Sequence, residues 1–561
     1  MKQTLIIFFS IISLQLNSQN YDKNYFSPPV KFPLRLAGNF GEIRPNHFHS
    51  GIDLKAPYQG LPVYAPADGY ISRIRKSAGG YGNALYITHP NGLRTVYGHM
   101  QKFNNQLESF ATEIQYDENS FEFTSYPDSI KFPVKKGDII GYVGNTGRSY
   151  GPHLHFEIRE VEKDVPINPC YFNFKIKDNI KPKFFGLMVY AFDENGKING
   201  LSNKQKFKTY KKGTNYYLKN TINYSGKIGF SFNANDYLNA TKNTQGIYSV
   251  KLFLEDSLIY EHEIFRIPFE DARYVNSFID FEERKTTNKK YQKCFIEPGN
   301  NLDIYKFKGD AGVISIYNKH KVIIEIADIY GNKSKLLFSI NGKELTYQKT
   351  QKKDMFYFNK DNFFEKEDFR AYITKGSLYK NIEQKYQVLP KTTNLYSNIY
   401  KLESYKVPAH KKIHIAISTK QLPKELVSKA LIIKIDKHGN YKSLGGTYIN
   451  NFFATSTKEF GKFAIAIDKT PPKITEENFN SEKNFSKKNK ISFIISDNLS
   501  GIKKYEAKID EKNIIFSYDE KNNRIIYIFD NHIIYNKPHK LVLTVTDKKN
   551  NKSLYKTIFF K

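Results

Sequence analysis

The sequence contains no tryptophan and only two cysteines, Cys170 and Cys294, in 561 residues. Two thiols are too few for a disulfide scaffold or for a metal site built from cysteine. We expect them to be separate buried thiols, because they lie in regions that we assign to different domains. Beyond an apolar run from Leu5 to Leu14, no stretch reaches the roughly 18 apolar residues that a transmembrane helix needs.

The first residues have the layout of a secretory signal peptide. Lys2 precedes the apolar run, and small and polar residues follow it. We therefore predict a signal peptide over residues 1–19 and an exported, soluble mature protein without a transmembrane segment. It would lie in the periplasm or cell envelope, or outside the cell. Residues 20–35 contain several prolines and are expected to form an extended linker.

Acidic residues are scarce relative to basic ones, which gives a formal net charge of +30. The excess could attract anionic polymers of the cell envelope, or it could reflect a general bias toward lysine. A nucleic-acid site should appear as a more local basic patch. The basic residues are spread over the whole chain, so we predict no nucleic-acid partner, and the charge says little about the substrate.

The length predicts several domains, because a single core rarely grows beyond about 250–300 residues. Residues 36–175 are rich in glycine and in short strand-like runs separated by turn signals, which predicts a mostly antiparallel β domain. Residues 101–133 interrupt this pattern. We expect them to form a surface insertion beside the functional site, with a helix in its first half.

The rest of the chain contains an internal repeat. The copies begin with DNIKPK at Asp178 and DKTPPK at Asp468, continue with similar segments around Asp236 and Asp497, and end alike at Asp328 and Asp547.

We interpret the two copies, residues 176–344 and 468–561, as immunoglobulin-like β-sandwiches, the first with an insertion. Residues 345–467 form another β-rich module between them. The predicted fold class is thus mostly β. We expect no cluster of titratable residues at ligand spacing in these modules, whose function is left open between spacing, partner binding and substrate targeting.

Histidine is concentrated in the first domain. Of the 13 histidines, six fall between Pro45 and Glu157: His47, His49, His89, His99, His153 and His155. In the run GPHLHFEIR, residues 151–159, alternation along a strand would place both histidines on one face with Glu157 and Arg159. The apolar residues between them would face a core.

His49 and Asp53 of HSGID could form a metal site together with these histidines. Nearby proline and glycine make a helix improbable, so a loop or extended segment must bring the two together. Zn²⁺ accepts imidazole and carboxylate ligands, and a catalytic site keeps one position for water. His49, Asp53 and one histidine of the strand would supply three ligands, while the second strand histidine and His99 would contact water or substrate. Amide hydrolysis fits this arrangement.

Four segments together resemble the lysostaphin-type (M23 or LytM) zinc metallopeptidases, over about residues 36–159: GNFGEIRPNHFHSGIDLKAP, VYAPADGYI, GYGNALYITHPNGLRTVYGHM and VKKGDIIGYVGNTGRSYGPHLHFEI. The resemblance implies that His49, Asp53 and His155 bind Zn²⁺. It further implies that His99 and His153 are the catalytic pair. Strand geometry alone leaves the choice between His153 and His155 open.

Some neighbouring residues have two interpretations. Arg44 lies where some family members have a tyrosine, so it either replaces that tyrosine or is a solvated loop residue. His47 is expected to face water and His89 to be a turn residue. Glu157 either orients a metal-binding histidine or is exposed on the strand. The loop over residues 144–151 should aim the two strand histidines at the metal.

We therefore predict an exported zinc metalloendopeptidase that hydrolyses the peptide cross-links of bacterial peptidoglycan. Its partners would be peptidoglycan peptides, with envelope proteins as candidate partners of the C-terminal β modules. One alternative is a catalytically silent envelope adaptor that regulates other wall hydrolases. The other is a secreted protease that acts on proteins outside the wall.

Overall fold

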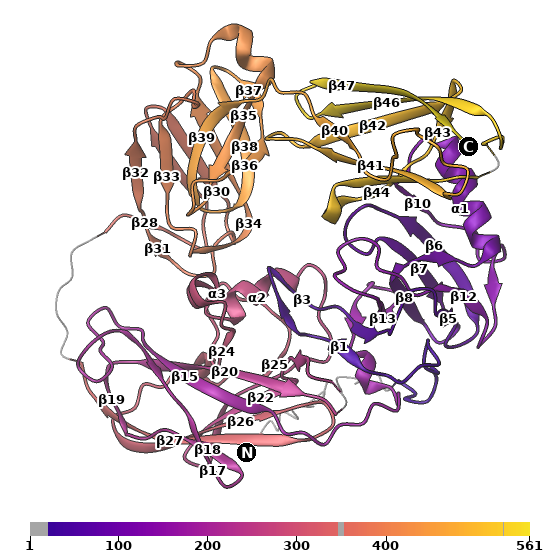
Figure 1. Ribbon diagram of the computed structural model, residues 1–561. Coiled ribbons are helices and arrows are strands. Elements are labelled where there is room, and N and C mark those ends of the chain that lie inside the picture. The colour runs from indigo at the N-terminus through magenta and orange to yellow at the C-terminus, as the bar shows by residue number, and fades with distance from the viewer. Residues whose placement is uncertain (1–20, 240, 346–352, 531) are drawn as a thin grey trace, which may run out of the picture.

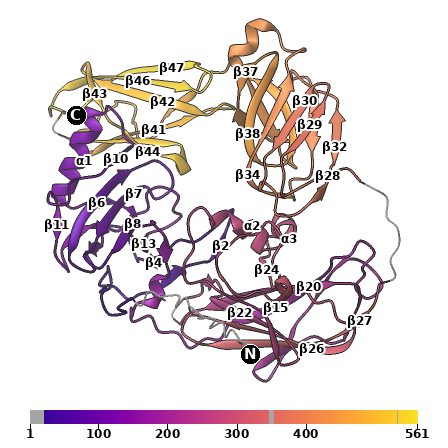
Figure 2. The same cartoon turned by 180° about the vertical axis from the view of Figure 1, so that it is seen from behind.

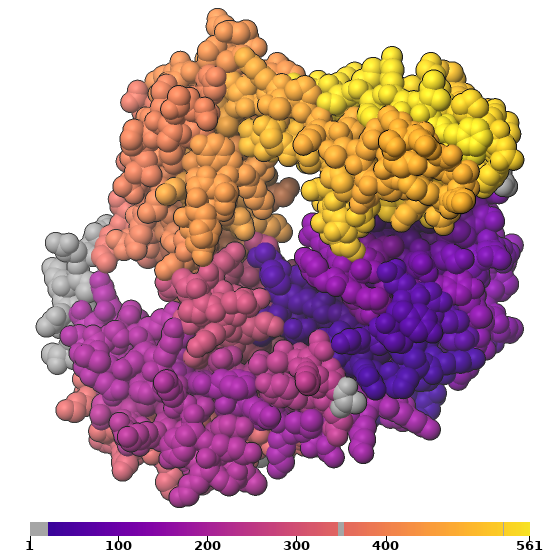
Figure 3. All heavy atoms as spheres, viewed as in Figure 1, coloured from indigo at the N-terminus to yellow at the C-terminus, as the bar shows by residue number. Residues whose placement is uncertain are grey.

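The structure is a computed structural model that describes residues 21–239, 241–345, 353–530 and 532–561. The expected signal peptide lies outside these ranges. Strands dominate all four parts of the chain, which confirms the mostly β prediction. The parts follow one another around a ring, so the C-terminal module lies beside the N-terminal domain (Figures 1 and 2). The space-filling view shows an opening inside this ring (Figure 3). Within the described ranges, no helix is both long and apolar enough to cross a membrane.

The N-terminal domain is built on an antiparallel sheet with the strand order β1-β4-β13-β8-β7-β6-β10, to which β11 and β14 add short edges. The bounds are β1 Leu36–Gly38, β4 Ile52–Lys55, β6 Gly69–Lys76, β7 Asn83–Thr88, β8 Leu93–Met100, β10 Phe123–Ser125, β11 Pro133–Val134, β13 His153–Glu160 and β14 Pro166–Ile167. Leu154, Phe156 and Ile158 of β13 are fully buried in the hydrophobic core. As predicted, the alternation leaves the histidines on the other face.

Shorter elements surround this sheet. They are the hairpin of β2 (Ile43–Arg44) and β3 (His47–Phe48), and a small sheet of β5 (Pro62–Tyr64), β12 (Ile139–Tyr142) and β9 (Lys102–Phe103). The insertion contains α1 (Asn105–Asp117), which confirms the helix expected there. The Asn104 side chain caps its N-terminus by accepting a hydrogen bond from the amide of Leu107. Leu107 and Ala111 anchor the helix in the core.

The second module consists of two sheets that enclose one core. The first sheet contains β15 (Lys183–Ala191), β16 (Lys204–Phe207), β20 (Ile228–Tyr237), β21 (Thr244–Gln245) and β24 (Tyr291–Lys293). The second contains β17 (Tyr210–Lys212), β18 (Asn215–Tyr217), β19 (Ile222–Ser225), β22 (Ser249–Leu254), β23 (Ser257–Glu263), β25 (Tyr305–Phe307), β26 (Asn318–Ala327) and β27 (Lys333–Lys343). Helices α2 (Val275–Phe278) and α3 (Phe281–Thr287) lie in its insertion.

The third module also has two facing sheets with a core of their own. One contains β29 (Asn362–Lys366), β30 (Phe369–Ile373), β34 (Pro408–Ser418), β38 (Phe452–Glu459) and β37 (Thr447–Ile449). The other contains β32 (Tyr386–Leu389), β33 (Ile399–Leu402), β39 (Gly461–Ile467), β35 (Ala430–Ile435) and β36 (Tyr441–Gly445), and a short pair joins β28 (Met355–Phe356) to β31 (Ile382–Glu383).

The C-terminal module pairs two four-stranded sheets over a separate core. Their strands are β40 (Lys473–Glu476), β41 (Lys490–Ser496), β45 (Arg524–Ile528) and β44 (Ser517–Asp519) in one sheet, and β43 (Lys512–Ile514), β42 (Ile502–Ile509), β46 (Pro538–Asp547) and β47 (Lys552–Phe560) in the other. The three C-terminal units are thus two-layered. Their immunoglobulin-like character and the domain boundaries stay predictions.

The two cysteines are free and buried, Cys170 in the core of the N-terminal domain and Cys294 in that of the second module. This confirms separate thiols. Neighbouring domains meet through apolar and polar contacts. Phe48 of β3 packs against Phe278 of α2 with ring centroids 5.5 Å apart. The Arg273 guanidinium donates to the carbonyls of Ala409 and Lys458 and so joins the second module to the third.

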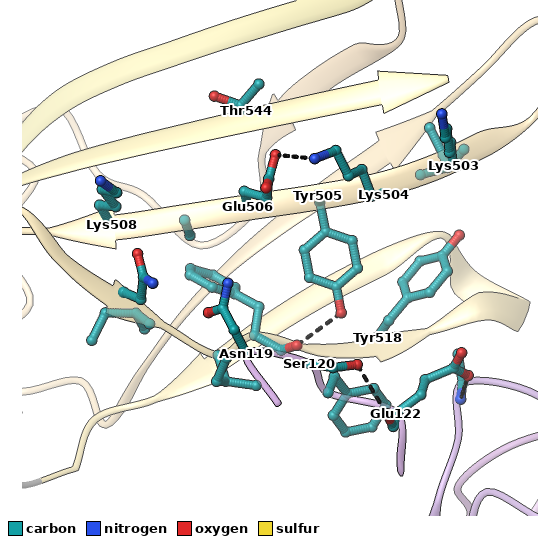
Figure 4. A pocket seen from close by; sticks show the side chains of 18 of the residues that line it. Asn119, Ser120, Glu122, Lys503, Lys504, Tyr505, Glu506, Lys508, Tyr518 and Thr544 are labelled. Atoms are coloured by element: carbon teal, nitrogen blue, oxygen red, sulfur yellow. Dashed lines mark hydrogen bonds and ion pairs between the residues drawn. The ribbon is translucent and has the colours of Figure 1, made fainter. Parts of the chain in front are cut away.

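The insertion also contacts the C-terminal module, and this contact closes the ring of four parts. Tyr116 of α1 donates a hydrogen bond of 3.0 Å to Asp530 and stacks on His532 at 4.5 Å. Lys521 bonds the carbonyl of Asn145. A cavity of about 970 Å³ lies at this junction, between residues 119–122 and strand β42 (Figure 4). None of the clustered histidines lines this cavity, so it is a feature of the domain contact.

Candidate functional site: a histidine and aspartate cluster

Strand pairing brings Asp53 and His155 together. In the register between β4 and β13, Asp53 lies opposite His155, whereas His153 lies opposite Lys55. Residues directly opposite in an antiparallel pair carry neighbouring side chains. His155 Nδ1 is 2.9 Å from Asp53 Oδ1, and His49 Nε2, from the segment before β4, is 3.1 Å from the same oxygen. All three side chains are buried.

The outer nitrogens of the two histidines are already engaged. His49 Nδ1 donates to the carbonyl of Asn39 at 2.8 Å, and His155 Nε2 donates to Glu157 at 2.7 Å. These bonds leave His49 Nε2 and His155 Nδ1 as the nitrogens that face Asp53, and each can coordinate a metal when it carries no proton. The three donor atoms lie within 4.8 Å of one another. Two imidazole nitrogens and one carboxylate oxygen are a donor set that suits Zn²⁺, so the residues fit this metal.

Contacts with charged neighbours affect the pKa values of Asp53 and His155 more than burial does. Burial alone would raise the pKa of Asp53, but His49 and His155 hold it well below its usual value. Burial likewise disfavours the charged form of His155, yet Asp53 and Glu157 raise its pKa to about 9. Burial lowers the pKa of His49. Asp53 is therefore ionised, and a metal that binds here must displace a proton from His155.

Glu157 holds the ring of His155 in place. It is fully buried, and its Oε1 accepts hydrogen bonds from His155, from Ser50 at 2.6 Å and from Tyr81 at 2.5 Å. Its Oε2 accepts one from Arg159 at 2.6 Å. Burial alone would raise the pKa of Glu157, but Arg159 and His155 lower it, so the group is ionised. Of the two interpretations of Glu157, the structure supports the orienting residue.

His99 and His153 lie beside the cluster, with ring centroids 4.8 Å apart. His153 Nδ1 donates to the carbonyl of Gly151 at 2.9 Å, and His99 Nδ1 donates to that of Thr146 at 2.8 Å. His153 Nε2 is 3.6 Å from Asp53 Oδ1. Both carbonyls belong to the loop over residues 144–151, so this loop orients His99 and His153. The expectation that it aims both strand histidines holds for His153 alone, because Asp53 and Glu157 hold His155.

Burial keeps these two rings neutral. It lowers the pKa of His99 to about 3 and also lowers that of His153. With Nδ1 carrying the proton, each ring has an unprotonated Nε2. His99 has a φ of 61°, which is uncommon for residues other than glycine. The geometry thus provides two neutral proton acceptors next to a candidate metal site.

The structure also tests the expectations for His47, His89 and Arg44. His47 is exposed, as expected. His89 is a buried residue next to a turn, and its ring nitrogens bond the Asp68 carbonyl and the Thr95 hydroxyl. Arg44 is paired with Asp53 Oδ2 at 2.5 Å, so the alternative of a solvated loop residue is wrong. Neither this pairing nor the contact of Tyr81 with Glu157 has a signal in the sequence.

The sheet and its buried cluster define a candidate metal-binding domain. Residues 47–112 and 129–169 match the model of peptidase family M23, and residues 353–468 match that of the Zu5-like domain. The match to family M23 lies within the N-terminal domain and confirms the resemblance found in the sequence.

Several similar proteins are named as peptidases, and the chain spans only about a fifth to a third of the length of the curated relatives it matches. The DD-carboxypeptidase/endopeptidase Mpg of Neisseria meningitidis is 42% identical over 121 residues, which are 22% of each chain. Peptidoglycan DD-endopeptidase ShyA of Vibrio cholerae is 28% identical over 183 residues, 30% of this chain and 36% of that one. The solved catalytic domain of lysostaphin from Staphylococcus simulans is 28% identical and covers 22% of this chain and 80% of its own, with a TM-score of 0.17.

Proposed function

We propose that the protein is an exported zinc endopeptidase that cleaves peptide cross-links in bacterial peptidoglycan. The observation that carries this proposal is the group of His49, Asp53 and His155, whose three donor atoms lie within 4.8 Å of one another. Relatives named as peptidoglycan DD-endopeptidases support the substrate class. An envelope location follows from that substrate.

In this proposal His49, Asp53 and His155 hold Zn²⁺. When bound, the ion would act as a Lewis acid on the scissile carbonyl and lower the pKa of water. His153 and His99 supply the proton chemistry. Each has a neutral Nε2 that can take a proton from the attacking water. Once protonated, the same nitrogen can donate a hydrogen bond to the developing oxyanion or pass the proton to the leaving amine.

Changing Glu157 to glutamine should weaken zinc binding by about 10–100-fold, because an amide cannot hold the His155 N–H as a carboxylate does. Competition with a chromogenic chelator measures the zinc affinity. Glu162, an exposed glutamate close by in the sequence, is the matched control, and Glu162→Gln should bind zinc like the unchanged protein. Equal zinc affinity in both variants would contradict the orienting role.

Digestion of labelled sacculi by the zinc-loaded full chain tests the proposed activity. New amino termini in the stem peptides, lost after chelation and restored by zinc, are the expected result. Intact sacculi at every metal concentration and pH tried would instead indicate an adaptor that regulates other hydrolases. Cleavage of casein without new termini in peptidoglycan would indicate a protease for non-wall proteins.

A further inference from the structure

The internal repeat contains two groups of three aspartates that the sequence does not reveal as clusters. One group is Asp178, Asp236 and Asp328, and the other is Asp468, Asp497 and Asp547. In each group, one carboxylate oxygen from every residue lies within 4.8 Å of the other two. The expectation that these modules lack titratable residues at ligand spacing is therefore wrong. Folding brings together single aspartates from three separate stretches of the chain, and Asp236 and Asp547 lie at the ends of strands β20 and β46.

In the first group, two carboxylate oxygens have no hydrogen-bond partner among the described residues. Asp236 is only 2% exposed, and its Oδ1 is buried and accepts no hydrogen bond from the described residues. The same holds for Asp178 Oδ2. Within the described ranges, no lysine, arginine or histidine forms an ion pair with Asp178, Asp236 or Asp328. Burying several carboxylates without a counter-charge is costly, and a bound cation would remove that cost.

The electrostatics of the group agree with this conclusion. Burial and the nearby Asp328 raise the pKa of Asp236 to about 8. The same two causes raise the pKa of Asp178 to about 6. A bound cation would remove this penalty, because it favours the ionised form of each carboxyl.

The third aspartate of each group belongs to a turn that also occurs without a cluster. Asp328 accepts hydrogen bonds from the backbone and side-chain amides of Asn332, and Asp547 accepts the same bonds from Asn551. Asp436 of the third module makes this turn with Asn440, but it is exposed and belongs to no aspartate group. The turn is thus a structural motif of these modules. The two additional aspartates are what distinguish the clusters.

Both groups lie where one domain joins the next. Leu238, two residues after Asp236, is buried in the core of the N-terminal domain, and Ile329, next to Asp328, packs against that core. Leu499, two residues after Asp497, packs against a cluster of the third module. In both groups, a residue beside one of the aspartates therefore contacts the preceding domain.

We propose that Asp178, Asp236 and Asp328 bind a calcium ion that fixes the N-terminal domain against the second module. A donor set made only of carboxylate oxygens suits a hard cation. Ca²⁺ tolerates irregular coordination and can complete its shell with carbonyls and waters, whereas Mg²⁺ demands near-octahedral geometry. The proposal does not extend to the equivalent group in the C-terminal module, because Lys549 lies close to Asp468 and Asp547 and supplies positive charge there.

Calorimetric titration of the zinc-loaded full chain with CaCl₂ tests the proposal. The unchanged protein should bind calcium with a Kd of about 10⁻³ M or tighter, as extracellular calcium modules do. Asp236→Asn should lose one bound calcium per chain and keep its zinc. Asp436→Asn, which changes the turn without a cluster, should bind as much calcium as the unchanged protein. Asp178→Asn should lose the same calcium ion. It therefore replaces Asp236→Asn in the test if that variant does not fold.

Equal calcium stoichiometry in the unchanged protein, Asp236→Asn and Asp178→Asn would overturn the proposal. The absence of any calcium binding at about 10 mM would also overturn it, since that concentration exceeds the Kd of weak extracellular sites. Equal affinity for MgCl₂ would overturn the assignment to calcium. Because the readout is calcium stoichiometry at constant zinc content, these results are independent of peptidase activity.

Discussion

Replacing His49, Asp53 or His155 should remove both the bound zinc and the peptidase activity. Asp53→Asn is the most informative change, because it keeps the shape of the side chain while removing the charge that both histidines contact. Loss of the Lewis acid forfeits several kcal/mol of transition-state stabilisation, which corresponds to a decrease in turnover of about a thousandfold or more. Metal analysis of the purified variants and digestion of labelled sacculi measure the two effects.

His47 provides the matched control for His49→Ala. It is an exposed histidine two residues away on the same segment, and its Nδ1 bonds the carbonyl of Pro45. His47→Ala should therefore retain zinc and turnover. A His49→Ala variant that holds a full equivalent of zinc would show that the three donor atoms do not form the metal site.

Much of the site could be predicted because it depends on local rules. Strand alternation places Leu154 in the core and His155 on the opposite face, and the structure has this arrangement. The proline and glycine around His49 exclude a helix and predict a loop or extended segment, and His49 lies in the connection between β3 and β4. The choice of His155 over His153 could not come from such rules. It depends on the register that sets Asp53 opposite His155, and single-strand patterns do not contain the register.

Contacts between distant loops could not be predicted for the same reason. The bond between Lys521 and Asn145 and that between Tyr116 and Asp530 join residues hundreds of positions apart without any periodic signal. The aspartate clusters are an intermediate case. The internal repeat pairs Asp178 with Asp468, Asp236 with Asp497 and Asp328 with Asp547, but nothing in the sequence indicates that the three aspartates of one copy meet in space.

The loop over residues 144–151 links this domain arrangement to the chemistry. Its carbonyls at Thr146 and Gly151 fix the rings of His99 and His153, and its Asn145 carbonyl receives the C-terminal module through Lys521. A displacement of the C-terminal module should therefore move the rings of His99 and His153 before it moves Asp53 and His155. The register between β4 and β13 fixes those two residues. The proposed proton-transfer residues and the proposed metal ligands are thus held by different parts of the fold. Substitutions should be able to separate the two functions.

His99→Ala and His153→Ala should retain zinc and lose turnover by about 10²–10⁴-fold, the usual contribution of a positioned acid–base group. Neither ring supplies an atom to the group formed by His49, Asp53 and His155, and each is held by a carbonyl of the loop. Zinc content, KM and kcat should be measured together, because loss of proton transfer lowers kcat at an unchanged metal content. If His153→Ala instead released zinc as completely as His155→Ala, His153 would be a ligand and the division of roles would be wrong.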